Sequence, residues 1–220
     1  MQRKRIEIGE EVAPKKTFVW ALDWPGWCRP GKDRDLAIAS LIDHADRYAL
    51  VAKQAGLPFP TVTADALHTV ESATGGTGTE FGVPSSITDA DRRRVTRKEA
   101  ERIASIVEAA WVVFDRVAAK APPELRKGPR GGGRDRDKVI GHVIEADHAY
   151  AREIGVRLPT PSIDDRAAVD AERAAVLDVL RQPSDGSPLA DRKWTLRYAA
   201  RRIAWHALDH AWEMQDRTEP

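Results

Sequence analysis

The chain has 220 residues, 42% hydrophobic and 31% charged, which is typical of a globular protein rather than a disordered or fibrous one. Lysine and arginine number 35 against 34 aspartates and glutamates, so the net charge is +1. This balance gives no electrostatic case for nucleic acid or an anionic membrane as the partner. The one cysteine excludes an internal disulfide. No apolar run approaches the length needed to span a bilayer and no signal-peptide pattern opens the chain, so the expected location is the cytoplasm.

The N-terminal part is expected to contain strands followed by a helix. Residues 3–9 alternate weakly between polar and apolar, and residues 17–24 are rich in aromatic and β-forming side chains. Residues 33–56 carry apolar side chains at helical spacing, and Gly56 and Pro58 are expected to end that helix.

The next segment, residues 57–92, lacks a helical period. Two short strand-like pieces, 67–72 and 79–83, flank the glycine-rich residues 74–78. This arrangement predicts a β-hairpin with its loop at 74–78.

Four helices are predicted in the C-terminal part. Thr96 and Glu99 form a capping box at the start of the first, and Ser162 or Asp164 is the N-cap candidate of the third. The predicted ranges are 96–120, 136–154, 162 or 164 to 181, and 194–216.

The order of these elements predicts an α+β protein in two parts. Residues 1–90 are expected to form a small module of β-strands and one helix, followed by the hairpin-like segment. Residues 91–220 are expected to form a four-helix bundle, with the join near residues 85–95.

His206 and His210 lie four residues apart in the last predicted helix, which puts both imidazoles on one face, one turn apart. Two such nitrogens can reach a single divalent metal, but a catalytic metal requires three or more ligands. His142 is the best third candidate, because it lies among the core-facing positions of residues 136–154. Since metal sites in bundles are built from facing helices, these three histidines are predicted to form one open site.

The histidines could instead have purely structural roles. Histidines four residues apart occur often on surface helices, and a histidine on an apolar face is commonly bonded to a backbone carbonyl. His44 and His68 have no partner at ligand spacing and are interpreted as structural, and His148 is expected at the surface.

Three imidazoles with nearby carboxylates favour zinc, nickel or iron, and the sequence does not choose among them. The other ring nitrogens need acceptors, and three carboxylates are available: Asp209, Glu145 and Glu213.

The stretch from about residue 95 to 216 resembles the DinB-like superfamily. The resemblance rests on residues 141–147 (GHVIEAD) and 206–210 (HALDH). Members of that family are four-helix bundles with a divalent metal held by one histidine of the second helix and an H-x3-H pair of the fourth. Matching positions imply His142, His206 and His210 as the ligands. Characterised members include transferases and isomerases that use mycothiol, bacillithiol or glutathione, so the resemblance implies a metal that activates a low-molecular-weight thiol.

Arg202 is the candidate catalytic residue of this site. It precedes His206 by four residues and is expected to face the metal, where it could hold a carboxylate of the thiol cofactor or of the substrate. The alternative is an internal ion pair of Arg202 with Glu213 or Asp209.

Residues 3–56 are similar to the HicB-like fold, in which a three-stranded sheet packs on one helix and a Pro-Gly turn, here Pro25-Gly26, follows the second strand. HicB proteins are antitoxins, but this likeness implies a fold rather than a function. Without a DNA-binding tail or a basic face, a regulatory role is the weaker interpretation.

Several other residues have two interpretations. Cys28 follows a turn beside basic residues, as a reactive thiol would, but a small buried filler is preferred. Trp20, Trp24 and Trp27 are expected to pack the sheet against the bundle rather than to line a ligand pocket. Residues 131–133, three glycines, lack the context of a phosphate loop and are interpreted as a linker.

The leading functional prediction is a DinB-like, divalent-metal-dependent enzyme that activates a thiol or water and transfers it to a small electrophilic substrate, as a thiol S-transferase or a hydrolase. The alternative is a non-catalytic protein that binds a ligand or partner and whose histidines are structural or store metal. Pairing as a homodimer is a further expectation, because bundles of this size often form dimers.

Overall fold

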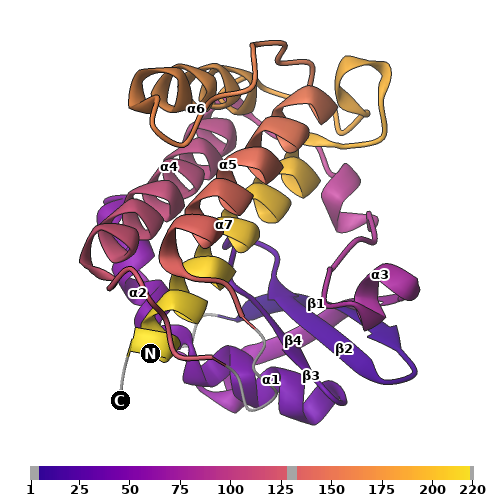
Figure 1. The fold of residues 1–220 in the computed structure, drawn as a ribbon. Helices are drawn as coiled ribbons and strands as arrows, with labels where there is room; N and C mark the ends of the chain where they lie inside the picture. The colour runs from indigo at the N-terminus through magenta and orange to yellow at the C-terminus, as the bar shows by residue number, and fades with distance from the viewer. Residues whose placement is uncertain (1–4, 128–132, 219–220) are drawn as a thin grey trace.

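The computed structural model describes residues 5–127 and 133–218 and has a four-stranded sheet together with helices (Figure 1). The α+β class predicted from the sequence is confirmed. The strands are β1 (Ile6–Ala13), β2 (Lys16–Ala21), β3 (Cys28–Gly31) and β4 (Leu67–Thr74). The α-helices are α1 (Arg34–Asp43), α2 (Ala45–Gln54), α3 (Thr77–Glu80), α4 (Arg97–Lys120), α5 (Arg136–Glu153), α6 (Arg166–Leu180) and α7 (Leu196–Thr218). Short 3-10 helices are η1 (Ala64–Ala66), η2 (Ala90–Arg92) and η3 (Leu189–Asp191).

The sheet has the strand order β3-β2-β1-β4 and is mixed. β1 and β2 form an antiparallel pair, as do β2 and β3, while β4 lies parallel to β1. The predicted hairpin around residues 74–78 is therefore wrong, because the strand before it pairs with β1 and residues 79–83 form no strand.

Glu11 explains why residues 79–83 do not form a strand. Its buried carboxylate accepts a hydrogen bond from the Thr79 hydroxyl and others from the Ser85 and Ser86 amides, the last at 2.8 Å. A buried carboxylate needs such donors. The chain therefore wraps around Glu11, beginning with the single turn of α3, instead of returning along β4.

The predicted helix over residues 33–56 is divided at His44 into α1 and α2. The His44 Nδ1 donates to the Ser40 carbonyl at 2.9 Å, and its ring lies 5.2 Å from the ring of Trp212 on α7. On the two sides of this break, α1 packs against β2 and β3, whereas α2 packs against α4.

The capping box of α4 is confirmed. The Glu99 amide donates to the Thr96 hydroxyl at 3.3 Å, and the Thr96 amide donates to the Glu99 carboxylate at 2.8 Å. At α6 the cap is Asp165, whose carboxylate accepts from the Ala168 amide at 3.0 Å, rather than Ser162 or Asp164.

The sheet is covered on both faces near β2. Phe18 and Trp20 point to one side, where they cluster with Cys28 and with Trp205 of α7. Val19 points to the other side and belongs to the main hydrophobic core, which also contains residues of α1 and α4. All three of the strand-region tryptophans are buried, and the expected role of Trp20 in packing the sheet against the last helix is confirmed.

The long helices pack in pairs, α4 against α7 and α6, and α5 against α7 and α6 (Figure 1). Asp147 of α5 is buried between them. Its Oδ2 accepts a hydrogen bond from Trp111 Nε1 of α4 at 2.8 Å, and Arg173 of α6 lies 5.2 Å from the Trp111 ring. A buried polar contact thus joins three of the four helices.

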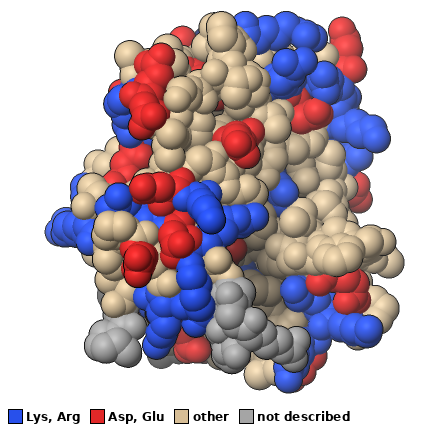
Figure 2. Space-filling model, viewed as in Figure 1, with Lys and Arg blue, Asp and Glu red and all other residues tan. Residues whose placement is uncertain are grey.

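Positive and negative side chains are interspersed on the face shown in Figure 2, as the near-zero net charge leads one to expect. Within residues 5–127 and 133–218, no helix has the length and apolar character needed to cross a bilayer.

Candidate metal centre

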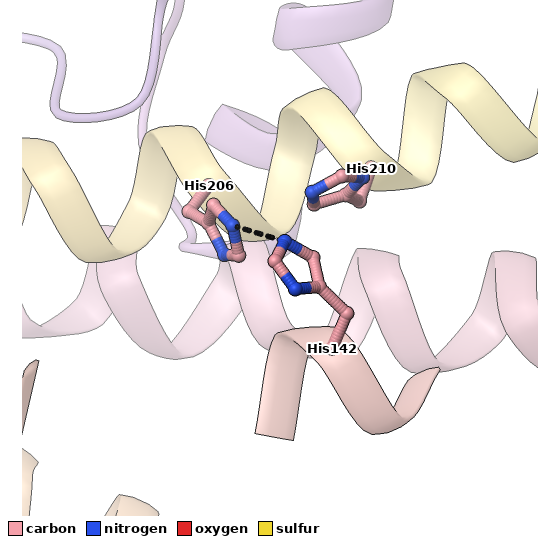
Figure 3. A group of neighbouring side chains, drawn as sticks. All are labelled: His142, His206 and His210. Carbon is pink, nitrogen blue, oxygen red and sulfur yellow. Dashed lines mark hydrogen bonds between the residues drawn. The ribbon is translucent and has the colours of Figure 1, made fainter. Parts of the chain in front are cut away.

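Three histidines from two helices meet between α5 and α7. His206 and His210 project from one face of α7 toward His142 of α5 (Figure 3). One nitrogen of each ring lies within 4.8 Å of the corresponding nitrogens of the other two. The Nε2 atoms of His142 and His206 are 3.3 Å apart. The structure therefore brings together all three residues that the sequence predicts as metal ligands.

The neighbouring residues on both helices explain this convergence. On α5, Val139 and Val143 flank His142 and are fully buried, so the same face turns toward the protein interior. On α7, Ala207 and Ala211 are also fully buried and follow each histidine directly. Each of the three histidines is therefore next to a residue of the protein interior.

Burial keeps two of the imidazoles neutral. The pKa of His206 falls to about 2, chiefly because the ring is buried and further because His210 and His142 lie beside it. Burial also lowers the pKa of His142, followed by the effects of His210 and Arg134. A histidine must be deprotonated at the nitrogen that binds a metal, so both rings are in the form that coordination requires.

The Nδ1 atoms of His210 and His206 differ in their hydrogen-bond partners. His210 Nδ1 donates to Glu213 Oε2 at 2.8 Å, which leaves Nε2 free for a metal, and this contact lowers the pKa of Glu213. That pairing was among those expected from the sequence. His206 Nδ1 is buried and has no partner among the described residues. The Nε2 atoms of His142 and His206 lie within hydrogen-bond distance of each other, and the three imidazoles together are a donor set that fits a divalent ion.

Asp209 is not an acceptor for these histidines. Its carboxylate instead accepts from Arg29 Nη1 of β3 at 2.7 Å. The predicted use of Asp209 as a histidine acceptor is therefore wrong. The spacing of residues in a motif could not have identified Arg29 as the partner of Asp209, because the two lie 180 residues apart in the sequence.

Arg202 lies next to the histidines but forms neither of the ion pairs considered for it. Its Nη2 donates to the Tyr150 hydroxyl at 3.0 Å, and its guanidinium carbon lies 4.8 Å from the centre of the Trp205 ring. The Tyr150 ring in turn lies 5.6 Å from the His206 ring. Arg202 therefore keeps its positive charge unpaired among the described residues, beside the proposed ligands.

The remaining candidates lie away from this cluster. His148 was expected at the surface, but its Nδ1 contacts Glu172 Oε2 of α6 at 2.6 Å, because the buried carboxylate of Glu172 requires a partner. Cys28 is fully buried, and burial raises the pKa of its thiol to about 12, so it is the filler that the sequence favoured. Gly131 and Gly132 of the predicted linker lie outside the described residues.

Comparison of the chain with protein-family models finds no match, and comparisons with curated proteins and with solved structures find no significant match.

Proposed function

We propose that His142, His206 and His210 bind one divalent metal ion and that the protein is a metal-dependent enzyme of the DinB-like type. The observation that carries this proposal is the convergence of the three ligand nitrogens within 4.8 Å. Two of them come from positions 64 residues apart in the sequence, so their meeting is a product of the tertiary fold. Zinc, nickel and iron all suit three imidazole ligands.

Three protein ligands leave coordination positions for a substrate, which is the pattern of catalytic rather than structural sites. A bound divalent ion would lower the pKa of a thiol or of water and so supply a nucleophile near neutral pH. We further propose a low-molecular-weight thiol as the source of that nucleophile and a small electrophilic molecule as the substrate.

The residues around the histidines have separable roles in this reaction. Glu213 accepts a hydrogen bond from His210 Nδ1 and thereby holds the ring in the orientation that presents Nε2. Arg202 is available to hold a carboxylate of the thiol or of the substrate, since no described carboxylate occupies it. Tyr150 accepts a hydrogen bond from Arg202 and so fixes the direction of its guanidinium group.

The proposed fold is a DinB-like four-helix bundle of α4, α5, α6 and α7, preceded by a HicB-like module. The pairwise packing of α4 and α5 with both α6 and α7 supports the first part. The antiparallel order of β1, β2 and β3 followed by α1 supports the second. The parallel strand β4 is an addition to the three-stranded sheet expected of that module.

Elemental analysis of protein purified without an affinity tag tests the metal site. The native protein should carry about one divalent ion per chain. His142→Ala and His206→Ala should each lose it, whereas His68→Ala, a histidine of β4 outside the cluster, should retain it. Circular dichroism checks that each variant is folded. Absence of metal from the native protein, together with normal folding of the triple alanine variant, would refute the site.

A thiol-consumption assay with a panel of small electrophiles tests the catalytic part. Metal-loaded protein should consume thiol, and Arg202→Gln should reduce the rate while leaving the metal content unchanged. A normal metal content without thiol consumption or hydrolysis of any electrophile would instead support a protein that binds a ligand or partner without catalysis.

A further inference from the structure

A second candidate site lies away from the histidines, at the end of the sheet where β1 begins and the segment after η2 meets the start of α7. A cleft of about 450 Å³ is present there, within the size range of small-ligand sites. Three segments of the chain contribute arginines to it. We call it the arginine cleft and define it by Arg5, Arg93, Arg94, Arg197 and Arg201.

The cleft continues into a smaller recess of about 220 Å³ that shares most of its lining residues. This recess adds Arg102, whose guanidinium lies 4.5 Å from the centre of the Trp24 ring. Leu22, Pro25 and Ile103 line both spaces and give them an apolar wall. A ligand that fits the whole space would therefore have a charged part and an apolar part.

Positive charge exceeds negative charge in this space. Four carboxylates line it, and three of them are paired with arginines of the cleft: Glu7 with Arg93 at 3.3 Å, Glu99 with Arg197 at 3.1 Å, and Asp91 with Arg201 at 2.6 Å. Arg5 and Arg94 form no ion pair with a described residue, and Arg102 donates only to a backbone carbonyl, that of Asp23. Six arginines against four carboxylates leave an excess of two positive charges.

Arg201 forms a rigid floor for the cleft. It is only 5% exposed, and its guanidinium carbon lies 4.4 Å from the centre of the Trp20 ring. Its Nε and Nη2 donate to Asp91, and Nη2 also donates to the Ser86 carbonyl. Its Nη1 makes no hydrogen bond to another described residue. This nitrogen is accessible from the cleft, so an oxyanion bound there could accept a hydrogen bond from it.

The positive charge of Arg197 is in an electrostatically unfavourable position. It lies in the first turn of α7, where the helix dipole disfavours a cation, and that turn contains no acidic residue. Its partner Glu99 belongs to α4, and the Glu99 side chain is 46% exposed. Water therefore screens much of the attraction between Glu99 and Arg197. An anion in the cleft would stabilise Arg197 and Arg201 together.

We propose that the arginine cleft binds a small organic anion that carries at least two negative charges on phosphate or carboxylate groups. Guanidinium groups donate paired hydrogen bonds to both kinds of oxyanion. The apolar part of the ligand would lie against Leu22, Pro25 and Ile103. The four carboxylates in the walls disfavour a long polyanion such as a nucleic acid. The site is independent of the metal centre, because none of the three clustered histidines lines it.

Isothermal titration calorimetry with pyrophosphate and with citrate, at low salt, tests this proposal. The double variant Arg5→Ala/Arg94→Ala removes two cleft charges without removing a side-chain ion pair of the folded state. Its affinity for the preferred probe should fall at least about tenfold, as expected for the loss of charge-assisted hydrogen bonds. Stronger binding of pyrophosphate than of citrate would identify a phosphate ligand, and the reverse a carboxylate ligand.

Two controls distinguish binding in the cleft from binding elsewhere on the protein. Arg152→Ala/Arg157→Ala removes the same charge from exposed positions at and beyond the end of α5 and should leave the affinity unchanged. His142→Ala should also leave it unchanged, since the anion would not bind at the metal centre. The proposal is overturned if neither probe binds at millimolar concentration. It is equally overturned if the control double variant loses as much affinity as the cleft variant, or if His142→Ala abolishes binding.

Discussion

Replacing Asp147 with asparagine should make the stability of this protein less dependent on pH. The carboxyl group is 7% exposed, its Oδ2 accepts from Trp111 Nε1, and its Oδ1 has no partner among the described residues. Burial raises the pKa of Asp147 to about 7, although Arg173 and the Trp111 hydrogen bond act in the opposite direction. Arg173 compensates weakly because it lies 3.9 Å from Asp147 and is bonded to Asp115 at 2.8 Å.

The magnitude follows from proton linkage. The pKa of Asp147 is higher in the folded protein than its ordinary value of 3.8, so the folded state binds this proton more tightly than the unfolded chain does. The resulting stabilisation is fully present below about pH 4 and is lost as the pH rises through about 7. Between pH 5 and pH 8 the wild-type protein should lose about 3 kcal/mol of unfolding free energy through this group alone.

Urea denaturation of both proteins between pH 5 and pH 8, with a chelator present throughout, measures this effect. The stability of Asp147→Asn relative to wild type should rise by about 3 kcal/mol across that interval, because the amide does not ionise and its oxygen can still accept from Trp111. Asp178→Asn, at an exposed position of α6, is the control and should show no such trend. A difference between wild type and Asp147→Asn that stays constant within about 0.5 kcal/mol would refute the reasoning.

Two further predictions concern packing. Because Cys28 is fully buried and its thiol pKa is raised to about 12, native protein at pH 8 should not react with a thiol reagent until urea unfolds it; rapid labelling of the folded protein would contradict this. Gly26 has φ +90°, and an added Cβ would lie 2.9 Å from side-chain carbons of Ala204 and Leu208. Gly26→Ala should therefore cost about 2–4 kcal/mol in thermal or urea unfolding. Gly56→Ala, at φ +70° with open space around it, should cost only about 1 kcal/mol, and equal losses would argue against a steric cause.

Local features of the sequence were reliable where the interacting groups lie within a few residues of each other. The capping box of Thr96 and Glu99 formed as expected, since both partners belong to one helical turn. The spacing of His206 and His210 likewise determined that both rings share a face of α7. By contrast, β4 paired with β1 instead of forming a hairpin, because the buried carboxylate of Glu11 draws residues 79–86 around itself.

The sequence by itself determined the α+β class, most helix boundaries and the pair of histidines on α7, because helical periodicity and caps act over one or two turns. The sequence also indicated His142 as the third ligand, but only the tertiary structure decided that it meets that pair, that Arg29 pairs with Asp209, and that the arginine cleft exists. These contacts join segments that are far apart in the sequence, up to 180 residues for Arg29 and Asp209. Their geometry depends on how helices and strands pack against each other, and no local pattern of residues specifies that packing.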